Sequence, residues 1–150
     1  MSSQQTTDSP QIKLTYEWAE GFRKKDLGVI AKLLHEDHRR ITYPQSLGIP
    51  EQTKEEYIQQ MTEIINVWTD GCELTLHSII ETPGTLVVHF TNKANTSLGV
   101  EMVRESIMIG QIVTDEDGSL KIKRIEEFTD SKSYLDLLKA LGEARAKVNK

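Results

Sequence analysis

A carboxylic acid stands in the middle of an apolar run in the segment VRESIMIG, residues 103–110. Strand alternation places Glu105 on one face with Val103, Ile107 and Ile109. Desolvation among aliphatic groups favours the protonated form of a carboxyl, which can then act as a general acid or as a neutral hydrogen-bond donor. Glu105 is therefore a candidate catalytic residue. Two alternatives stay open, namely an ion pair with an arginine of a neighbouring strand and a solvent-facing position on a strand whose outer face is apolar.

Two histidines on consecutive expected strands could supply a base. His89 lies in LVVHFTN, and His77 precedes it by twelve residues, on the other side of the Pro83-Gly84 turn. Antiparallel pairing about this turn places His77 near Phe90 or Val88 and so could make the two histidines near neighbours. His89, in the middle of its strand, is a second candidate catalytic residue. The alternative for each is a partly exposed histidine that is hydrogen-bonded to a backbone carbonyl.

The remaining residues with metal-binding chemistry indicate no metal site. His35 and His38 stand three residues apart in HEDH, which we interpret as a polar surface corner at the end of a helix. Cys72 is the only cysteine, so it can form neither an internal disulfide nor a thiolate zinc site, and a lone cysteine at a strand start is usually a buried hydrophobe. We expect no metal and no cofactor.

The elements that must position these residues change period along the chain. Helical spacing of apolar residues predicts helices over 11–23, 27–38 and 53–69, with Asp26 and Thr53 as N-caps and Glu56 completing a capping box with Thr53. A short strand, RRITY, ends at Pro44. From residue 72 the period becomes two, which predicts a run of long strands, and a last helix follows Asp130. Helices segregated from strands indicate an α+β domain.

Composition excludes several classes of protein. The 150 residues carry a net charge of −5 and no block of basic residues, so we expect no nucleic-acid partner. No segment approaches the roughly 20 apolar residues that span a bilayer, and residues 1–10 are polar. We expect a flexible tail over 1–10, one domain over 11–150, no membrane partner and a cytoplasmic location.

The order of elements and several segments resemble the SnoaL-like branch of the nuclear transport factor 2-like superfamily, and in particular its fungal members. The likeness covers about residues 11–135, through YEWAEGFRKKDLGVIAKLLHEDHRRITYP, GIPEQTKEEYIQQM, VRESIMIG and LKIKRIEEFTDS. The resemblance implies a cone: a curved antiparallel or mixed β-sheet wrapped around N-terminal helices, with a C-terminal helix and a deep apolar pocket. It also implies a homodimer through the open face of the sheet.

The resemblance assigns roles to particular residues. The end of the first strand lies at the pocket mouth, where ketosteroid isomerases carry an aspartate base, but this chain has Tyr43, whose phenol is a poor base at neutral pH and a good donor to a carbonyl or enolate oxygen. Trp18 stands near a position that carries a tyrosine in those isomerases, so we exclude that activity. Glu105 falls where the branch has a carboxylic acid that faces the pocket.

The last strand offers a further carboxyl. One of Glu126 and Glu127 must face the concave side. We choose Glu127 because it directly precedes Phe128 in the EEFTDS segment, and the resemblance retains a residue at this position. A structural ion pair of Glu127 with Arg104, Arg39 or Arg40 is the alternative. The expected pocket-lining residues are aromatic or aliphatic, namely Trp18, Phe22, Tyr57, Trp68, Val103, Ile107 and Phe128.

Two functions follow from these expectations. The first is a cofactor-independent lyase or isomerase (a cyclase, dehydratase or isomerase) that acts on a small apolar oxygenated metabolite by acid and base chemistry. Its expected catalytic residues are Glu105, His89, Tyr43 and Glu127. The second is a non-catalytic module of the same fold, for ligand binding or dimerisation. The two differ in whether titratable groups converge in an open cavity or aromatic rings fill it.

Overall fold

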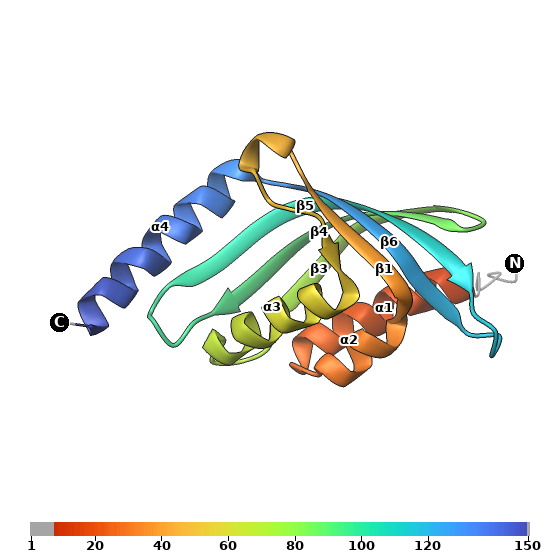
Figure 1. Ribbon diagram of the computed structural model, residues 1–150, viewed down its shortest axis with the longest axis horizontal. Coiled ribbons are helices and arrows are strands. Elements are labelled where there is room, and N and C mark those ends of the chain that lie inside the picture. The colour runs from red at the N-terminus through yellow and green to blue at the C-terminus, as the bar shows by residue number, and fades with distance from the viewer. Residues whose placement is uncertain (1–7, 150) are drawn as a thin grey trace, which may run out of the picture.

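A computed structural model describes residues 8–149 of the chain (Figure 1). Its elements in chain order are α1 (Pro10–Arg23), α2 (Leu27–Leu33), β1 (Leu34–Tyr43), the short 3₁₀ helix η1 (Gln45–Leu47), β2 (Gln52–Thr53), α3 (Lys54–Val67), β3 (Glu73–Thr82), β4 (Thr85–Asn95), β5 (Glu101–Thr114), β6 (Leu120–Thr129) and α4 (Ser131–Val148). None of the described helices has the length and apolar content needed to cross a membrane.

The strands form one mixed sheet in the order β2-β1-β6-β5-β4-β3. β1 pairs with β6 in parallel, and the other neighbours are antiparallel. Figure 1 shows the sheet curving over α1, α2 and α3, while α4 leaves the end of β6 and projects beyond the strands. The predicted α+β class, with a curved sheet around N-terminal helices and a C-terminal helix, is confirmed.

Alternation divides each long strand between two faces of the sheet. On the inner face, which packs on the helices, the buried side chains are Leu86, Val88 and Phe90 of β4, Met102, Ser106 and Met108 of β5, and Ile122, Ile125, Glu127 and Thr129 of β6. The outer face carries no helix in Figure 1, and several large apolar side chains there are about half exposed.

The helices begin where side-chain capping predicts them to begin. Thr53 and Glu56 form the capping box of α3, Asp26 caps α2, and Asp130 caps α4. α1 begins earlier than expected, because Ser9 accepts the backbone N–H of Ile12 as its N-cap. Ser9 and Pro10 of the predicted tail therefore belong to the start of α1, and residues 1–7 lie outside the described residues.

The prediction that the second helix continues to His38 is wrong. α2 ends at Leu33, and the next residues form β1, which pairs with β6. The tertiary pairing overrides the local helical pattern. His38 consequently lies on the inner face of β1, 1% exposed, with its Nδ1 at 2.8 Å from the carbonyl oxygen of Ile122. Burial lowers the pKa of His38 from 6.5 to about 4.

The loop between α3 and β3 passes directly against the end of α1. The backbone N–H of Cys72 donates to the carbonyl of Phe22 at 3.1 Å, and a Cβ on Gly71 would lie 1.6 Å from the carbonyl oxygen of Arg23. Only glycine fits this contact between two backbones. Cys72 itself is 1% exposed, and burial raises the pKa of its thiol to about 12, so its predicted place in the core is correct.

We expect Gly71→Ala to destabilise the protein by about 3 kcal/mol or more, because the added methyl meets backbone atoms that cannot rotate away. Gly142→Ala is the matched control, since a Cβ on this residue of α4 has open space and alanine is the better helix former. Urea unfolding of both variants measures the difference. Equal stability of the two variants would contradict the close contact.

We also expect His38 to make stability depend on pH between 6.5 and 4. The folded state keeps His38 neutral in this range while the unfolded chain takes up a proton, so its contribution is complete above pH 6.5 and is lost as pH falls towards 4. The loss amounts to roughly 3 kcal/mol. Urea unfolding at several pH values should give a shallower pH dependence for His38→Gln than for the wild type, and parallel curves would refute the assignment.

Candidate functional site

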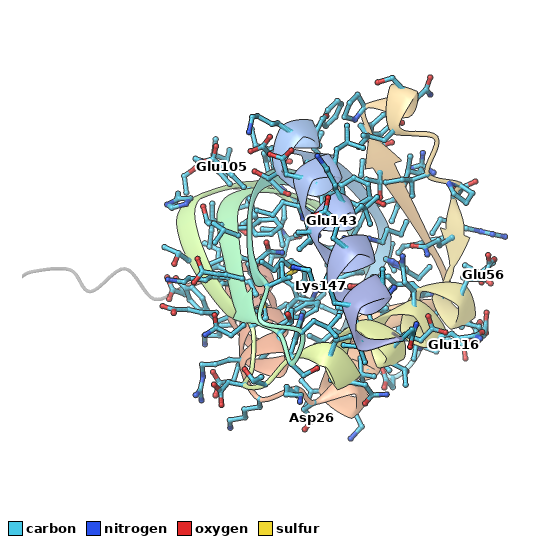
Figure 2. All side chains as sticks on the ribbon, turned by 90° about the vertical axis from the view of Figure 1, so that its left-hand side faces the viewer. Asp26, Glu56, Glu105, Glu116, Glu143 and Lys147 are labelled. Carbon is cyan, nitrogen blue, oxygen red and sulfur yellow. The ribbon has the colours of Figure 1, made fainter. Side chains whose placement is uncertain are left out.

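A cavity of about 360 Å³ lies between the inner face of the sheet and the helices. Residues from α1, α3, α4 and the strands β1, β3, β4, β5 and β6 line it. Its apolar wall includes Trp18, Phe22, Tyr57, Met61, Trp68 and Phe90. Figure 2 looks onto the side where α4 crosses in front of the strands. Tyr134, Leu137 and Leu141 of α4 contribute to the lining, so α4 covers the mouth of the cavity.

The aromatic rings of this wall pack on one another at its edge. The ring centroids of Trp18 lie 5.1 Å from those of Phe22 and 5.6 Å from those of Phe90, both edge to face, and Phe22 lies 6.4 Å from Trp68. Mutual packing holds these rings in place and leaves the space beside them open. Trp18, Phe22, Tyr57 and Trp68 thus line an open cavity.

A charged group stands in this apolar wall. Arg40 Nη2 donates to Glu127 Oε1 at 2.9 Å, and the two side chains are 10% and 4% exposed. Arg104 Nη2 lies 4.0 Å from Glu127 Oε2. The guanidinium of Arg40 also stacks over the ring of Tyr57, 4.5 Å from its centroid. Two cations and one carboxylate therefore converge at the cavity.

Strand register explains this convergence. β1 runs parallel to β6, with Arg40 opposite Ile125 and Thr42 opposite Glu127, so Arg40 and Glu127 lie two residues apart on the same face. β5 lies on the other side of β6, and alternation turns Arg104 inward together with its buried neighbours Met102 and Ser106. Each charged residue reaches the cavity from a different strand.

The buried position sets the protonation of two of these groups. Burial is the main cause that raises the pKa of the Tyr57 phenol above 10, so this hydroxyl stays protonated at neutral pH. Burial alone would lower the pKa of Arg40, but the adjacent Glu127 carboxylate and Tyr57 phenol outweigh it and raise that pKa. At neutral pH the cavity therefore presents a phenolic donor and a permanent cation.

Four buried polar atoms of the cavity wall have no hydrogen-bond partner within the described residues. They are Nε1 of Trp18, Nη1 of Arg40, Nε of Arg104 and Oδ1 of Asn92. Three of them are N–H donors. A buried donor without a partner costs about 1–3 kcal/mol, and folded proteins contain few such atoms. All four atoms belong to residues that line the same cavity.

The structure places Glu105 outside the cavity. Its side chain is 62% exposed and belongs to the outer face of β5, so the expectation of a desolvated carboxyl in a pocket is wrong. Val103 and Ile107 share this outer face and are about half exposed, and Phe128 and Tyr43 lie on the outer faces of β6 and β1, with their rings stacked at 4.7 Å. The predicted pocket-lining role of Val103, Ile107 and Phe128 is therefore also wrong.

Strand alternation accounts for these errors. Both alternating sets of β5 are largely apolar, and the set that contains Met102, Arg104 and Ser106 is the one that packs on the helices. Alternation separates two faces but does not tell which of them is inside. On β6 the same rule places Glu127 inward and Glu126 outward, where Glu126 pairs with Arg124.

The two histidines also lie on the outer face. A bulge in β3 between Leu76 and Ser78 turns His77 to the side of His89, and the ring centroids are 4.6 Å apart. His89 Nε2 lies 3.3 Å from Glu105 Oε2. The predicted proximity of the two histidines is correct, but neither lines the cavity.

The cavity is also lined by Arg40, Arg104 and Asn92. The sequence pattern had suggested the two arginines only as ion-pair partners of Glu127, and it had not suggested Asn92. Asn92 lies opposite Arg104 in the β4–β5 register, two residues after the buried Phe90. An aromatic side chain in the middle of a strand indicates the buried face. Alternation from Phe90 could therefore have placed Asn92, and its cross-strand partner Arg104, on the inner face.

No protein-family model and no curated protein matches the sequence. Many solved structures match the fold. The BvnE pinacolase of Penicillium brevicompactum superposes with a TM-score of 0.78 at 16% identity, over 91% of this chain and 96% of that chain. A SnoaL-like polyketide cyclase of Shewanella denitrificans, given as putative, has a TM-score of 0.69 at 8% identity, over 89% and 99%.

A nuclear transport factor 2-like protein of Burkholderia pseudomallei gives a TM-score of 0.68 at 19% identity, over 87% of this chain and 98% of that chain. These identities establish the fold alone. With a curved mixed sheet around three helices and a cavity on its inner face, the chain has the SnoaL-like, nuclear transport factor 2-like fold that its sequence resembles.

Proposed function

We propose that the cavity binds a small apolar molecule that carries oxygen, and that it catalyses a cofactor-independent lyase or isomerase reaction on that molecule. The observation that carries this proposal is the set of unpaired polar atoms in the cavity wall, on Trp18, Arg40, Asn92 and Arg104. A carbonyl, enol or phenol oxygen is the acceptor that three N–H donors require, and the aromatic wall suits an apolar body.

The charges of the cavity favour an anionic oxygen. Two guanidinium groups, of Arg40 and Arg104, face one carboxylate, that of Glu127, which leaves an excess of positive charge in a poorly solvated space. Donors held in place before the reaction stabilise negative charge that develops on a substrate oxygen, as an enolate does. Arg40 and Arg104 are the proposed oxyanion donors.

Glu127 is the proposed general base. Its carboxylate can take a proton from a carbon next to a carbonyl, or from a hydroxyl, and return it at another atom of the same substrate. The Tyr57 phenol, kept protonated by burial, is the proposed donor to the departing or forming oxygen. Glu105, His89 and Tyr43 have no role in this proposal, because their side chains lie on the outer face.

Proteins with related chemistry support the assignment. The fold is shared with a protein named a pinacolase and with a putative polyketide cyclase. Both names denote enzymes that act on small organic molecules. The cavity volume of about 360 Å³ lies within the range of about 300–1,000 Å³ that is typical of ligand pockets. The fold by itself fixes no substrate, so the proposal depends on the cavity.

We expect apolar oxygenated compounds to stabilise the protein in a thermal-shift screen of phenols, enones, lactones and steroids. A ligand at 100 times its Kd adds about 2.7 kcal/mol to the free energy of unfolding. With the ligands found, Glu127→Gln should lower turnover by about 10²–10⁴-fold, because it removes the base and keeps the size of the side chain.

Glu126→Gln is the matched control, since Glu126 is the adjacent residue on the same strand and faces outward. It should leave both the ligand response and turnover unchanged. Turnover that survives in Glu127→Gln would refute the role of Glu127. The absence of any stabilising compound in the screen would count against the open-cavity proposal as a whole.

We also propose that the chain forms a homodimer through the outer face of the sheet. Val103, Ile107 and Phe128 are 45%, 46% and 49% exposed there, and Ile107 and Phe128 are direct cross-strand partners. Exposed apolar side chains on a face without a covering helix mark an interaction surface, and a second copy offers the same patch to itself.

We expect Ile107→Glu to shift the protein from dimer to monomer, because it places a charge in the centre of this patch. Size-exclusion chromatography with light scattering measures the mass of each species. Leu135→Glu on α4 is the control, since Leu135 is 54% exposed and outside the patch, and its variant should stay dimeric. A wild-type monomer, or a dimer in both variants, would exclude this interface.

A further inference from the structure

Three side chains on the outer face form a cluster that the cavity does not use. His77 of β3, His89 of β4 and Glu105 of β5 bring one ligand atom each to within 4.8 Å of the others. The cavity lies on the opposite face, lined by Phe90 and Asn92, which alternate with His89 along β4. In Figure 2, Glu105 lies at the periphery of the molecule. We propose that His77, His89 and Glu105 form a binding site for a divalent transition-metal ion of the zinc type.

The geometry fits such an ion. His89 Nε2 and Glu105 Oε2 are 3.3 Å apart. Two ligands about 2.0–2.1 Å from a tetrahedral zinc ion lie about 3.3 Å from each other, so this pair already has the separation that zinc requires. The ligand atom of His77, an exposed residue, lies within 4.8 Å of the ligand atoms of His89 and Glu105.

The donor set fits the same ion. Two imidazoles and one carboxylate suit zinc and its neighbours among the transition metals, whereas magnesium prefers oxygen ligands alone. Three protein ligands leave a coordination position open. All three come from one chain, so a single copy of the protein completes the site.

β3 has a bulge at His77, one of the three residues of the proposed metal site. Counted back from the turn, regular alternation from Ile79, which faces inward opposite Val88, would place His77 on the inner face. The bulge between Leu76 and Ser78 instead leaves both His77 and Ser78 on the outer face, where His89 lies. His77 Nε2 is then hydrogen-bonded to Thr91 Oγ1 at 2.7 Å. Thr91 is the cross-strand partner of Glu105. A hydroxyl on a histidine ring is the kind of outer contact that orients a metal ligand, which makes Thr91 a positioning residue.

The test is isothermal titration calorimetry of the full chain, without a histidine tag and freed of metal by a chelator, with ZnCl₂. We expect saturable binding of one zinc ion per chain. His89→Ala and Glu105→Gln should weaken binding by more than about 100-fold, and Thr91→Val by about tenfold, because loss of an outer contact costs about 10–100-fold. The substituted side chains are at least partly exposed, and circular dichroism confirms that each variant is folded.

His35→Ala is the matched control, since His35 is a partly exposed histidine on β1, outside the cluster, and its variant should bind zinc as the wild type does. MgCl₂ serves as the control for the ion. Absence of zinc binding in the wild type, equal affinity in His89→Ala, or equal binding of magnesium would overturn the proposal. In each of these cases His89 and Glu105 form an ordinary surface contact.

Discussion

A buried ion pair between two parallel strands is the interaction on which the proposed function of the cavity depends. Removal of an arginine and a glutamate from water costs several kcal/mol for each ion, and mutual attraction repays this only with good geometry. Arg40 and Glu127 have that geometry: a 2.9 Å hydrogen bond, a tyrosine ring beneath the guanidinium and Arg104 as a second cation nearby. The pair nevertheless leaves Arg40 Nη1 unpaired.

The unpaired Nη1 of Arg40 connects the ion pair to the proposed function. A buried ion pair is often no more stabilising than apolar side chains of the same volume, so stability alone does not account for its presence. The unpaired donors around the cavity, by contrast, are suited to an oxygen atom of a ligand. The same sheet separates two kinds of surface by alternation. Charges that face the cavity are shielded by α3 and α4, while His77, His89 and Glu105 on the other face remain open to solvent or to a second copy.

Local signals in the sequence predicted much of the fold. The capping residues Asp26, Thr53 and Asp130 mark helix starts in the structure, since a capping side chain acts on its own turn and needs no tertiary partner. The end of α2 was not predictable in this way. Its continuation into β1 depends on β6, about ninety residues further along the chain, whose pairing overrides the local helical pattern.

The site was harder to predict for a related reason. Alternation along β5 correctly separates Glu105 from Arg104, but apolar residues accompany both of them, so the sequence pattern does not identify the buried set. Glu127 was placed on the inner side through the family resemblance, and its arginine partners were considered only as structural neighbours. The bulge that reorients His77 has no signal in the sequence that we could identify.

The central claim is that the Arg40–Glu127 pair is present for the ligand and its reaction rather than for stability. The double variant Arg40→Met with Glu127→Gln removes both charges and keeps an acceptor for Arg104, and its free energy of unfolding can be measured by urea denaturation beside the wild type. The account predicts a difference of less than about 2 kcal/mol, because isosteric replacement of a buried pair is often neutral. A loss of about 3–5 kcal/mol, the size expected for breaking a structural pair, would contradict it.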